Sequence, residues 1–262
     1  MTEPEVLYHE DAGIGLITLN RPDVLNAIDH AMTVELGRLL RDTATRPHLR
    51  VLVLTGAGRA FSAGHDLRQP PPSGDTPVRQ AREHLWALQE VTAGILEHPA
   101  VVIAAINGIA VGMAAEICTA ADLRLASEQG ELMFPEVHRA MFVTNGVLHL
   151  LPRAVGQARA ADWLLTGRRI PAAELLAAGF VSRVVPADQL LPAVMSLAQQ
   201  VASHAPRSVR RVKQLLHRSW ATDLRGMFLE EVDAVMETMT GTDGGEGTRA
   251  FLEKREPRYT GK

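Results

Sequence analysis

The chain has 262 residues, a formal net charge of -3 at pH 7 and a hydrophobic content of 46%. It is long enough to bury a substantial core, and this charge excludes the basic footprint of a nucleic-acid-binding or anionic-membrane-binding protein. The one cysteine, Cys118, excludes an intrachain disulfide and a cysteine metal cluster, as is typical of a reducing compartment.

The N-terminal stretch MTEPEVLYHEDAG has neither the basic segment nor the apolar segment of a secretory signal peptide. No apolar run is long enough to span a bilayer. We therefore expect a cytoplasmic protein without nucleic-acid or membrane partners. The excess of arginine over lysine and the abundant alanine indicate a bacterium with a GC-rich genome.

Short β-type segments and helical segments alternate through the first two thirds of the chain. Strands are predicted at 13–20, 50–56, 100–108, 122–127, 132–134 and 180–185, where Val, Ile and Leu gather before Gly, Asn or polar residues. Helices are predicted at 26–45 and 78–98 from apolar residues at helical spacing. This alternation predicts an α/β fold with a largely buried sheet.

The remainder of the chain differs in character. After Pro186 four amphipathic helices are predicted, which need a surface to cover, at 193–205, 208–220, 224–239 and 246–255. Residues 68–80 contain three consecutive prolines and read as an exposed loop, either a connector or a lid over a site.

Glu116 is the single charged residue in GIAVGMAAEICTAA (108–121). A carboxylate in apolar surroundings is unfavourable unless it is paired, solvated or used. Gly112 precedes a helix-forming run, so the free N–H of Met113 is expected at a helix start, with Glu116 about one turn further on the same face. Glu116 is then either a group in a functional cleft or a first-turn acid that complements the helix dipole.

A second glycine-bearing turn, TGAGRAFSAGHDL (55–67), follows the predicted strand 50–56. If the two strand ends are neighbours, the N–H of His65 points to the same cleft, and two such donors make an oxyanion hole. The imidazole of His65 is interpreted as a bystander. Glu136, after Phe134 and Pro135, is a second carboxylate in apolar company and a candidate partner for acid–base work, although acidic pairs are common.

Other chemistries find less support in the sequence. No G-x-G-x-x-G follows a strand, the ten histidines show no H-E-x-x-H spacing, and Ser62 with His65 lacks the G-x-S-x-G elbow of a serine hydrolase. Cys118 in a helix is interpreted as core packing. The tryptophans Trp86, Trp163 and Trp220 are interpreted as core or subunit contacts.

Nearly from end to end, the chain resembles the crotonase superfamily, also called the enoyl-CoA hydratase/isomerase family. The stretches that carry the resemblance are LITLNRPDVLNAI, AFSAGHDL, VIAAINGIAVGMAAEI, ADLRLAS, FPEV, LPRAVGQARAADWLLTGRRI, AAGFVSRVV and EGTRAFLEKREPRYTGK. The resemblance implies a spiral of ββα units in residues 1–190 and a C-terminal helical region, 191–262, that packs subunits into trimers, often paired as hexamers. It also implies an acyl-CoA thioester as ligand, with coenzyme A as part of the substrate and neither a separate cofactor nor a metal.

By the same resemblance, the oxyanion-hole donors fall on His65 and Met113 and the catalytic acids on Glu116 and Glu136. The substrate-binding residues that it implies are Ala63, His65, Asp66, Leu67, Gly112 and Thr144. With both acids present, hydration of a 2-enoyl-CoA is predicted. The alternatives are isomerisation by Glu136 alone and acyl-CoA binding without turnover.

Three departures from the family pattern bear on these predictions. Met113, Ala114 and Ala115 stand where glycines are usual, which predicts a narrower or differently shaped acyl pocket. The stretch Thr144-Asn145-Gly146-Val147 replaces a glycine-rich turn through which relatives place the water, so the placement of water is left open. His138 and Arg139 stand where small or aliphatic residues are usual, either at a polar acyl chain or on the surface.

Overall fold

Two sheets form the centre of the computed structural model, which describes residues 3–68 and 77–261. The larger has the order β1-β2-β3-β5-β7-β10 and the smaller the order β4-β6-β8-β9. The larger sheet contains β1 (Val6–Asp11), β2 (Ile14–Leu19), β3 (Val51–Gly56), β5 (Val101–Ile106), β7 (Leu123–Ser127) and β10 (Arg183–Val185). The smaller contains β4 (Ala60–Ser62), β6 (Ile109–Val111), β8 (Glu131–Met133) and β9 (Arg169–Pro171). Only β1 with β2 and β8 with β9 pair antiparallel among these described strands.

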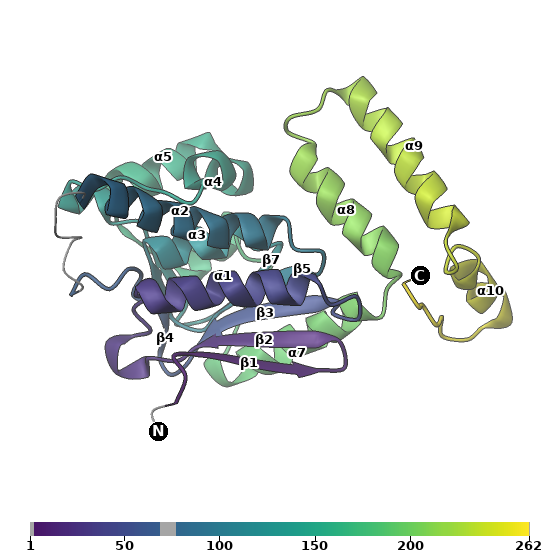
Figure 1. Cartoon of the computed structure of the whole chain (residues 1–262), viewed down its shortest axis with the longest axis horizontal. Coiled ribbons are helices and arrows are strands. Elements are labelled where there is room, and N and C mark those ends of the chain that lie inside the picture. The colour runs from purple at the N-terminus through teal and green to yellow at the C-terminus, as the bar shows by residue number, and fades with distance from the viewer. Residues whose placement is uncertain (1–2, 69–76, 262) are drawn as a thin grey trace.

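Helices cover both faces of the larger sheet (Figure 1). The helices are α1 (His30–Ala44), α2 (Pro77–Leu96), α3 (Met113–Ala120), α4 (Val147–Val155), α5 (Gln157–Thr166), α6 (Ala172–Ala177), α7 (Leu190–Ala202), α8 (Pro206–Arg218), α9 (Leu224–Thr240) and α10 (Glu246–Glu253). Three short 3-10 helices are η1 (Pro22–Val24), η2 (Glu136–Arg139) and η3 (Ala187–Gln189).

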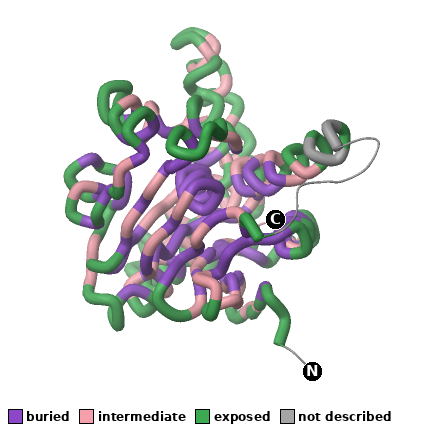
Figure 2. Tube along the Cα trace, turned by 90° about the vertical axis from the view of Figure 1, so that its left-hand side faces the viewer, coloured by how far each residue is buried: buried purple, intermediate pink, exposed green. Residues whose placement is uncertain are grey.

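Alternate residues of the buried strands face different cores. In β3, Leu52 and Leu54 pack with residues of α1 and α2, whereas Val51 and Val53 pack with residues of α7. A strand that is buried on both faces reads as a continuous apolar run, which is why VLVLTG shows no polar alternation. Figure 2 shows the buried strands at the centre of the molecule, with exposed segments around them.

The chain repeats one order of elements: a strand of the large sheet, a strand of the small sheet, then a helix. β3, β4 and α2 form one turn of this spiral, and β5, β6 and α3 form the next. β4, β6 and β8 run parallel, so their C-terminal ends meet at one edge of the small sheet. The segments that leave these three ends carry His65, Gly112 and Glu136.

The last three helices stand apart from the body of the molecule, whereas α7 lies against the large sheet (Figure 1). Lys213 of α8 anchors this part of the chain. It is buried, lies 2.7 Å from the Asp122 carboxylate, and donates to the carbonyl oxygens of Ile95 and Ala100. Within the described ranges, no helix has the length and apolar character that crossing a bilayer requires.

All six predicted strands are confirmed, with shifts of a few residues at the ends, and helices occur where the sequence predicts them. The strands β1, β4, β6 and β9 and the helices α4, α5 and α6 were not predicted. The predicted loop 68–80 falls largely outside the described residues, and α2 already begins at Pro77. Trp163 is fully buried, whereas Trp86 and Trp220 are exposed in the single chain.

Candidate active site

Gly112 joins the end of β6 to the start of α3 in a backbone conformation that favours glycine. Gly112 is the N-cap residue of α3, with a φ of 53° and a ψ of -122°. Its N–H donates to the Met133 carbonyl of β8 at 2.8 Å. A Cβ at this position would lie 2.7 Å from Oε1 of Glu136. The lack of a side chain at Gly112 therefore allows the Glu136 carboxyl to lie against the beginning of α3.

The turn after β4 approaches the same point. Gly64 has a φ of 82°, and a Cβ there would lie 2.3 Å from the Val111 carbonyl oxygen and 3.8 Å from the Met113 nitrogen. The backbone of Gly64 thus packs directly against the backbone of Val111. This contact brings His65, which follows Gly64, close to Met113, which follows Gly112. Within residues 3–68 and 77–261, neither the N–H of His65 nor that of Met113 donates to a protein acceptor.

Glu116 is almost completely buried, at 1% exposure, one turn into α3. Its Oε1 accepts from the Thr144 N–H at 2.7 Å, and its Oε2 accepts from the Thr144 hydroxyl at 3.0 Å and from the Asn145 amide at 2.8 Å. Burial raises the pKa of Glu116, and these three donors oppose that rise because they stabilise the charged form. Glu116 therefore does not point at solvent, and its place in the first turn of α3 also lets it complement the helix dipole.

Glu136 begins η2 directly after Phe134 and Pro135 and is 8% exposed. Its Oε2 is buried without a hydrogen-bond partner among the described residues. Burial raises the pKa of Glu136, and the negative charge of Glu116 raises it further. The two carboxyl groups therefore interact with each other, but only Glu116 is held by strong donors.

The remaining substrate-binding residues implied by the resemblance lie around this point. The Ala63 N–H donates to the Leu25 carbonyl, and Leu67 is largely exposed. The Asp66 carboxylate is buried and pairs with Arg68 at 2.6 Å and Arg21 at 3.3 Å. The hydrogen bonds from Arg68 hold the pKa of Asp66 well below its usual range. The ion pairs of Asp66 fix the position of the backbone directly after His65.

The side chains of Ser62 and His65 do not form a nucleophile–base pair. The Ser62 hydroxyl donates to the Asn26 carbonyl at 2.7 Å and accepts from the Gly64 N–H at 3.0 Å. The His65 ring packs instead against His84 of α2, with 5.1 Å between ring centroids, and burial lowers the pKa of His65. The hydrogen bonds of Ser62 thus hold the turn that presents Gly64.

Three other candidates lie outside the hydrogen bonds of this arrangement, although the charge of Arg139 opposes the rise in the pKa of Glu136. Cys118 is fully buried in α3. His138 is exposed and lies 2.7 Å from the Thr166 carbonyl oxygen, and Arg139 is also exposed. In the described part of the chain, no group of three or more His, Cys, Asp or Glu side chains is arranged to hold a metal ion.

The sequence places Asn145 in the turn that replaces the family's glycine-rich turn, but it does not predict the contact of Asn145 with Glu116. Asn145 is completely buried, has a φ of 52°, and reaches Glu116 because α4 packs on α3. The one available signal was the Asn145-Gly146 dipeptide, which is a turn motif. That signal predicts the turn but not the contact of Asn145 with Glu116.

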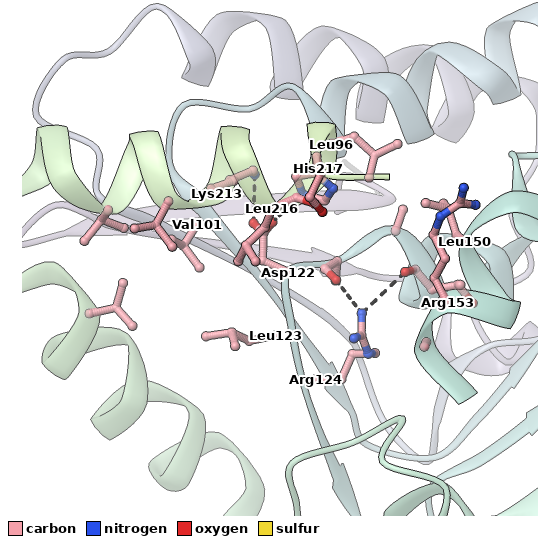
Figure 3. Close-up of a pocket in the computed structure, with 18 of the residues that line it drawn as sticks. Leu96, Val101, Asp122, Leu123, Arg124, Leu150, Arg153, Lys213, Leu216 and His217 are labelled. Carbon is pink, nitrogen blue, oxygen red and sulfur yellow. Dashed lines mark hydrogen bonds and ion pairs between the residues drawn. The ribbon is translucent and has the colours of Figure 1, made fainter. Parts of the chain in front are cut away.

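A cavity of about 710 Å³ lies between α8 and the body of the molecule (Figure 3). Its lining includes Leu123, Leu150, Leu216 and the Asp122–Lys213 pair but neither Glu116 nor Glu136. The acidic pair and this cavity are therefore separate features.

Comparison with known proteins places this chain in a described family. The sequence matches the family Enoyl-CoA hydratase/isomerase over residues 9–262. It is 37% identical over 257 residues to (E)-benzylidenesuccinyl-CoA hydratase of Thauera aromatica, covering 95% of this chain and 96% of that protein. It is 31% identical over 259 residues to 2,3-dehydroadipyl-CoA hydratase of Escherichia coli, covering 98% and 99%.

Solved structures agree on the fold. The crystal structure of an enoyl-CoA hydratase from Bacillus anthracis superposes with a TM-score of 0.94 at 32% identity, over 99% of this chain and all of that one. An enoyl-CoA hydratase from Mycobacterium smegmatis superposes with a TM-score of 0.91 at 28% identity, over 98% and 99%. The spiral of strand–strand–helix turns and the protruding C-terminal helices are thus shared with these proteins.

Proposed function

The chain belongs to the enoyl-CoA hydratase/isomerase family, and from this premise we propose that it adds water across the 2,3 double bond of a 2-enoyl-CoA. The observation that carries the proposal is the meeting, near the start of α3, of two buried carboxyl groups with two main-chain N–H groups that donate to no acceptor among the described residues. Coenzyme A is part of the substrate, and the proposed reaction uses neither a further cofactor nor a metal.

In the proposed reaction, Glu116 takes a proton from water, and the oxygen of that water attacks the β-carbon. The π electrons move toward the thioester, whose carbonyl oxygen becomes an enolate held by the N–H groups of His65 and Met113. Glu136 then gives its proton to the α-carbon. Each main-chain donor is worth roughly 3 to 4 kcal/mol of transition-state stabilisation.

The charge distribution in the site supports this division of roles. Three donors favour the ionised form of Glu116, which a base requires. Glu136 Oε2 has no donor among the described residues, and burial and the charge of Glu116 raise the pKa of Glu136 against the opposing charge of Arg139, which favours the protonated form that an acid requires. Ala63, Asp66, Leu67 and Gly112 would line the approach of the thioester.

Double-bond migration by Glu136 alone is the second candidate, because Glu136 by itself could move a proton between carbons. Binding without turnover is the third. The enclosure of Glu116 by Thr144 and Asn145 favours hydration over both, since neither alternative needs a buried, ionised second carboxylate.

Loss of ultraviolet absorbance on hydration of a conjugated 2-enoyl-CoA tests the proposal. Glu116→Gln and Glu136→Gln should each lower kcat by about 100-fold or more while substrate binding persists. Activity lost in Glu136→Gln but retained in Glu116→Gln would indicate an isomerase. Tight binding of enoyl-CoA by the wild type, with hydration no faster than background, would indicate a binding protein.

We also propose that α8, α9 and α10 assemble copies of the chain into a trimer or a pair of trimers. No residue of α9 is buried, and large apolar side chains are exposed in the single chain on α9, on α10 and in the turn after α8, among them Trp220, Phe228, Leu229, Val232, Met236 and Phe251. Exposed apolar area of this extent is typical of protein interfaces. Trp220 also lines the cavity beside α8.

Sedimentation velocity tests the assembly. The wild type should sediment as a trimer or hexamer, and Val232→Glu should shift it toward monomer, whereas Arg41→Glu on α1 should not. A wild type that is monomeric at micromolar concentration would contradict the proposal.

A further inference from the structure

The carboxylate of Glu116 is held by two consecutive residues from the turn before α4. Thr144 contributes its N–H and its hydroxyl, and Asn145 contributes its side-chain amide. Asn145 and Gly146 both have positive φ, at 52° and 68°, so the chain folds back sharply onto α3. We refer to the Thr144 hydroxyl and the Asn145 amide as the Glu116 clamp.

The hydrogen bonds are distributed unequally over the two carboxylate oxygens. Each oxygen can accept about two hydrogen bonds. Oε2 accepts both bonds of the clamp, at 3.0 and 2.8 Å, whereas Oε1 accepts only the Thr144 N–H at 2.7 Å. Oε2 is therefore saturated, and the free acceptor position of Glu116 is on Oε1.

We propose that Thr144 and Asn145 are positioning residues that keep Glu116 ionised and leave Oε1 as the oxygen that takes the proton from water. This inference rests on the proposed hydration. The clamp does not touch the reacting atoms, and it acts by fixing the rotation of the carboxylate and by stabilising its charge.

The backbone N–H of Thr144, which is not part of the clamp, also limits how the water can be held. The Thr144 N–H is already used by Oε1, so it is not free to bind the attacking water. The water must then depend on Oε1 and on other groups of the site. The titratable neighbour whose charge interacts with Glu116 is Glu136, which stays unchanged in every clamp variant.

Thr144→Val is the main test, because it removes the hydroxyl and keeps both the shape of the side chain and the backbone N–H. Asn145→Gly removes the amide independently, and glycine tolerates the φ of 52°. Thr144→Ser restores the hydroxyl and serves as the rescue variant. Thr45→Val is the matched control, since the exposed Thr45 hydroxyl only bonds to the Asp42 carbonyl at the end of α1.

Two measurements separate positioning from a general structural role. The first measurement is the pH profile of the hydration rate. Thr144→Val and Asn145→Gly should each lower kcat about tenfold with KM little changed. Each should also move the acidic limb to higher pH, because a base that has lost a donor protonates more readily. Thr144→Ser and Thr45→Val should retain the wild-type limb. Lower rates with the limb unmoved would overturn the proposal.

The second measurement does not depend on turnover. Nuclear magnetic resonance of protein labelled with ¹³C at the glutamate carboxyl groups follows the titration of Glu116, whose signal is identified by its loss in Glu116→Gln. The midpoint should be higher in Thr144→Val than in the wild type. Coinciding midpoints would refute the clamp, whereas a wild type that hydrates no enoyl-CoA would refute the proposed function and leave this titration to decide on the clamp.

Discussion

Replacement of Gly112 by alanine tests whether the close approach of Glu136 to the start of α3 matters for the reaction. The new Cβ would lie 2.7 Å from Glu136 Oε1, so that oxygen must move until the distance is an ordinary contact of at least 3.4 Å. A displacement of this size at a catalytic group lowers the rate by about 100-fold. The backbone, with φ 53° and ψ -122°, adds a strain of about 1–3 kcal/mol in stability.

Gly156→Ala provides the matched control for the strain alone. Gly156 has a φ of 84° and a ψ of 154°, and a Cβ there would meet no atom within 4 Å. Urea unfolding should show a loss of stability in both variants, and the enoyl-CoA absorbance assay should show a loss of kcat per folded molecule in Gly112→Ala only. A Gly112→Ala enzyme with wild-type kcat would refute the reasoning.

Three further predictions concern other residues. His65→Ala should change kcat by no more than about threefold, because its N–H remains; a loss near 100-fold, as expected on removing an oxyanion donor, would show that the imidazole takes part. Lys213→Met should lower the free energy of unfolding in urea by about 3–5 kcal/mol, because the partly buried Asp122 loses its Lys213 partner and keeps the Val102 N–H and His217, and a change within about 0.5 kcal/mol would contradict this. Burial lowers the pKa of His98 from its ordinary 6.5 to about 4. As the pH falls from about 6.5 to about 4, the imidazole is therefore protonated in the unfolded chain but not in the folded one, and the free energy of unfolding decreases. In urea titrations at pH 7 and pH 5, the wild type should lose about 2 kcal/mol more than His98→Asn, and equal losses would show that His98 carries no such linkage.

The sequence predicted the parts of the fold that long apolar runs determine. β3 and β5 are buried on both faces, and α1 carries apolar residues at helical spacing, so their patterns are unambiguous. β4, β6 and β9 have three residues each, as do β8 and β10, but only the last two stand out in the sequence as runs of Leu, Met, Phe or Val. β4, β6 and β9 form only because the spiral brings them into one sheet.

The same distinction applies to the site. Glu116 could be predicted because it is the one carboxylate in an apolar run. Gly112 could be predicted because it stands directly before a helix-forming run. The contact of Asn145 with Glu116 could not be found, since it depends on the packing of α4 against α3 and on a turn with positive φ. Local propensity does not contain that information.

The packing of Gly64 against Val111 has a consequence for how such a protein diversifies. The contact is made by main chain alone, so the two N–H groups beside it stay in place whatever side chains occupy positions 65 and 113. Substitutions at these two positions can therefore change the side chains around a bound acyl group and keep the two N–H groups that would stabilise its enolate. A lineage could in this way explore new substrates while its chemistry is conserved.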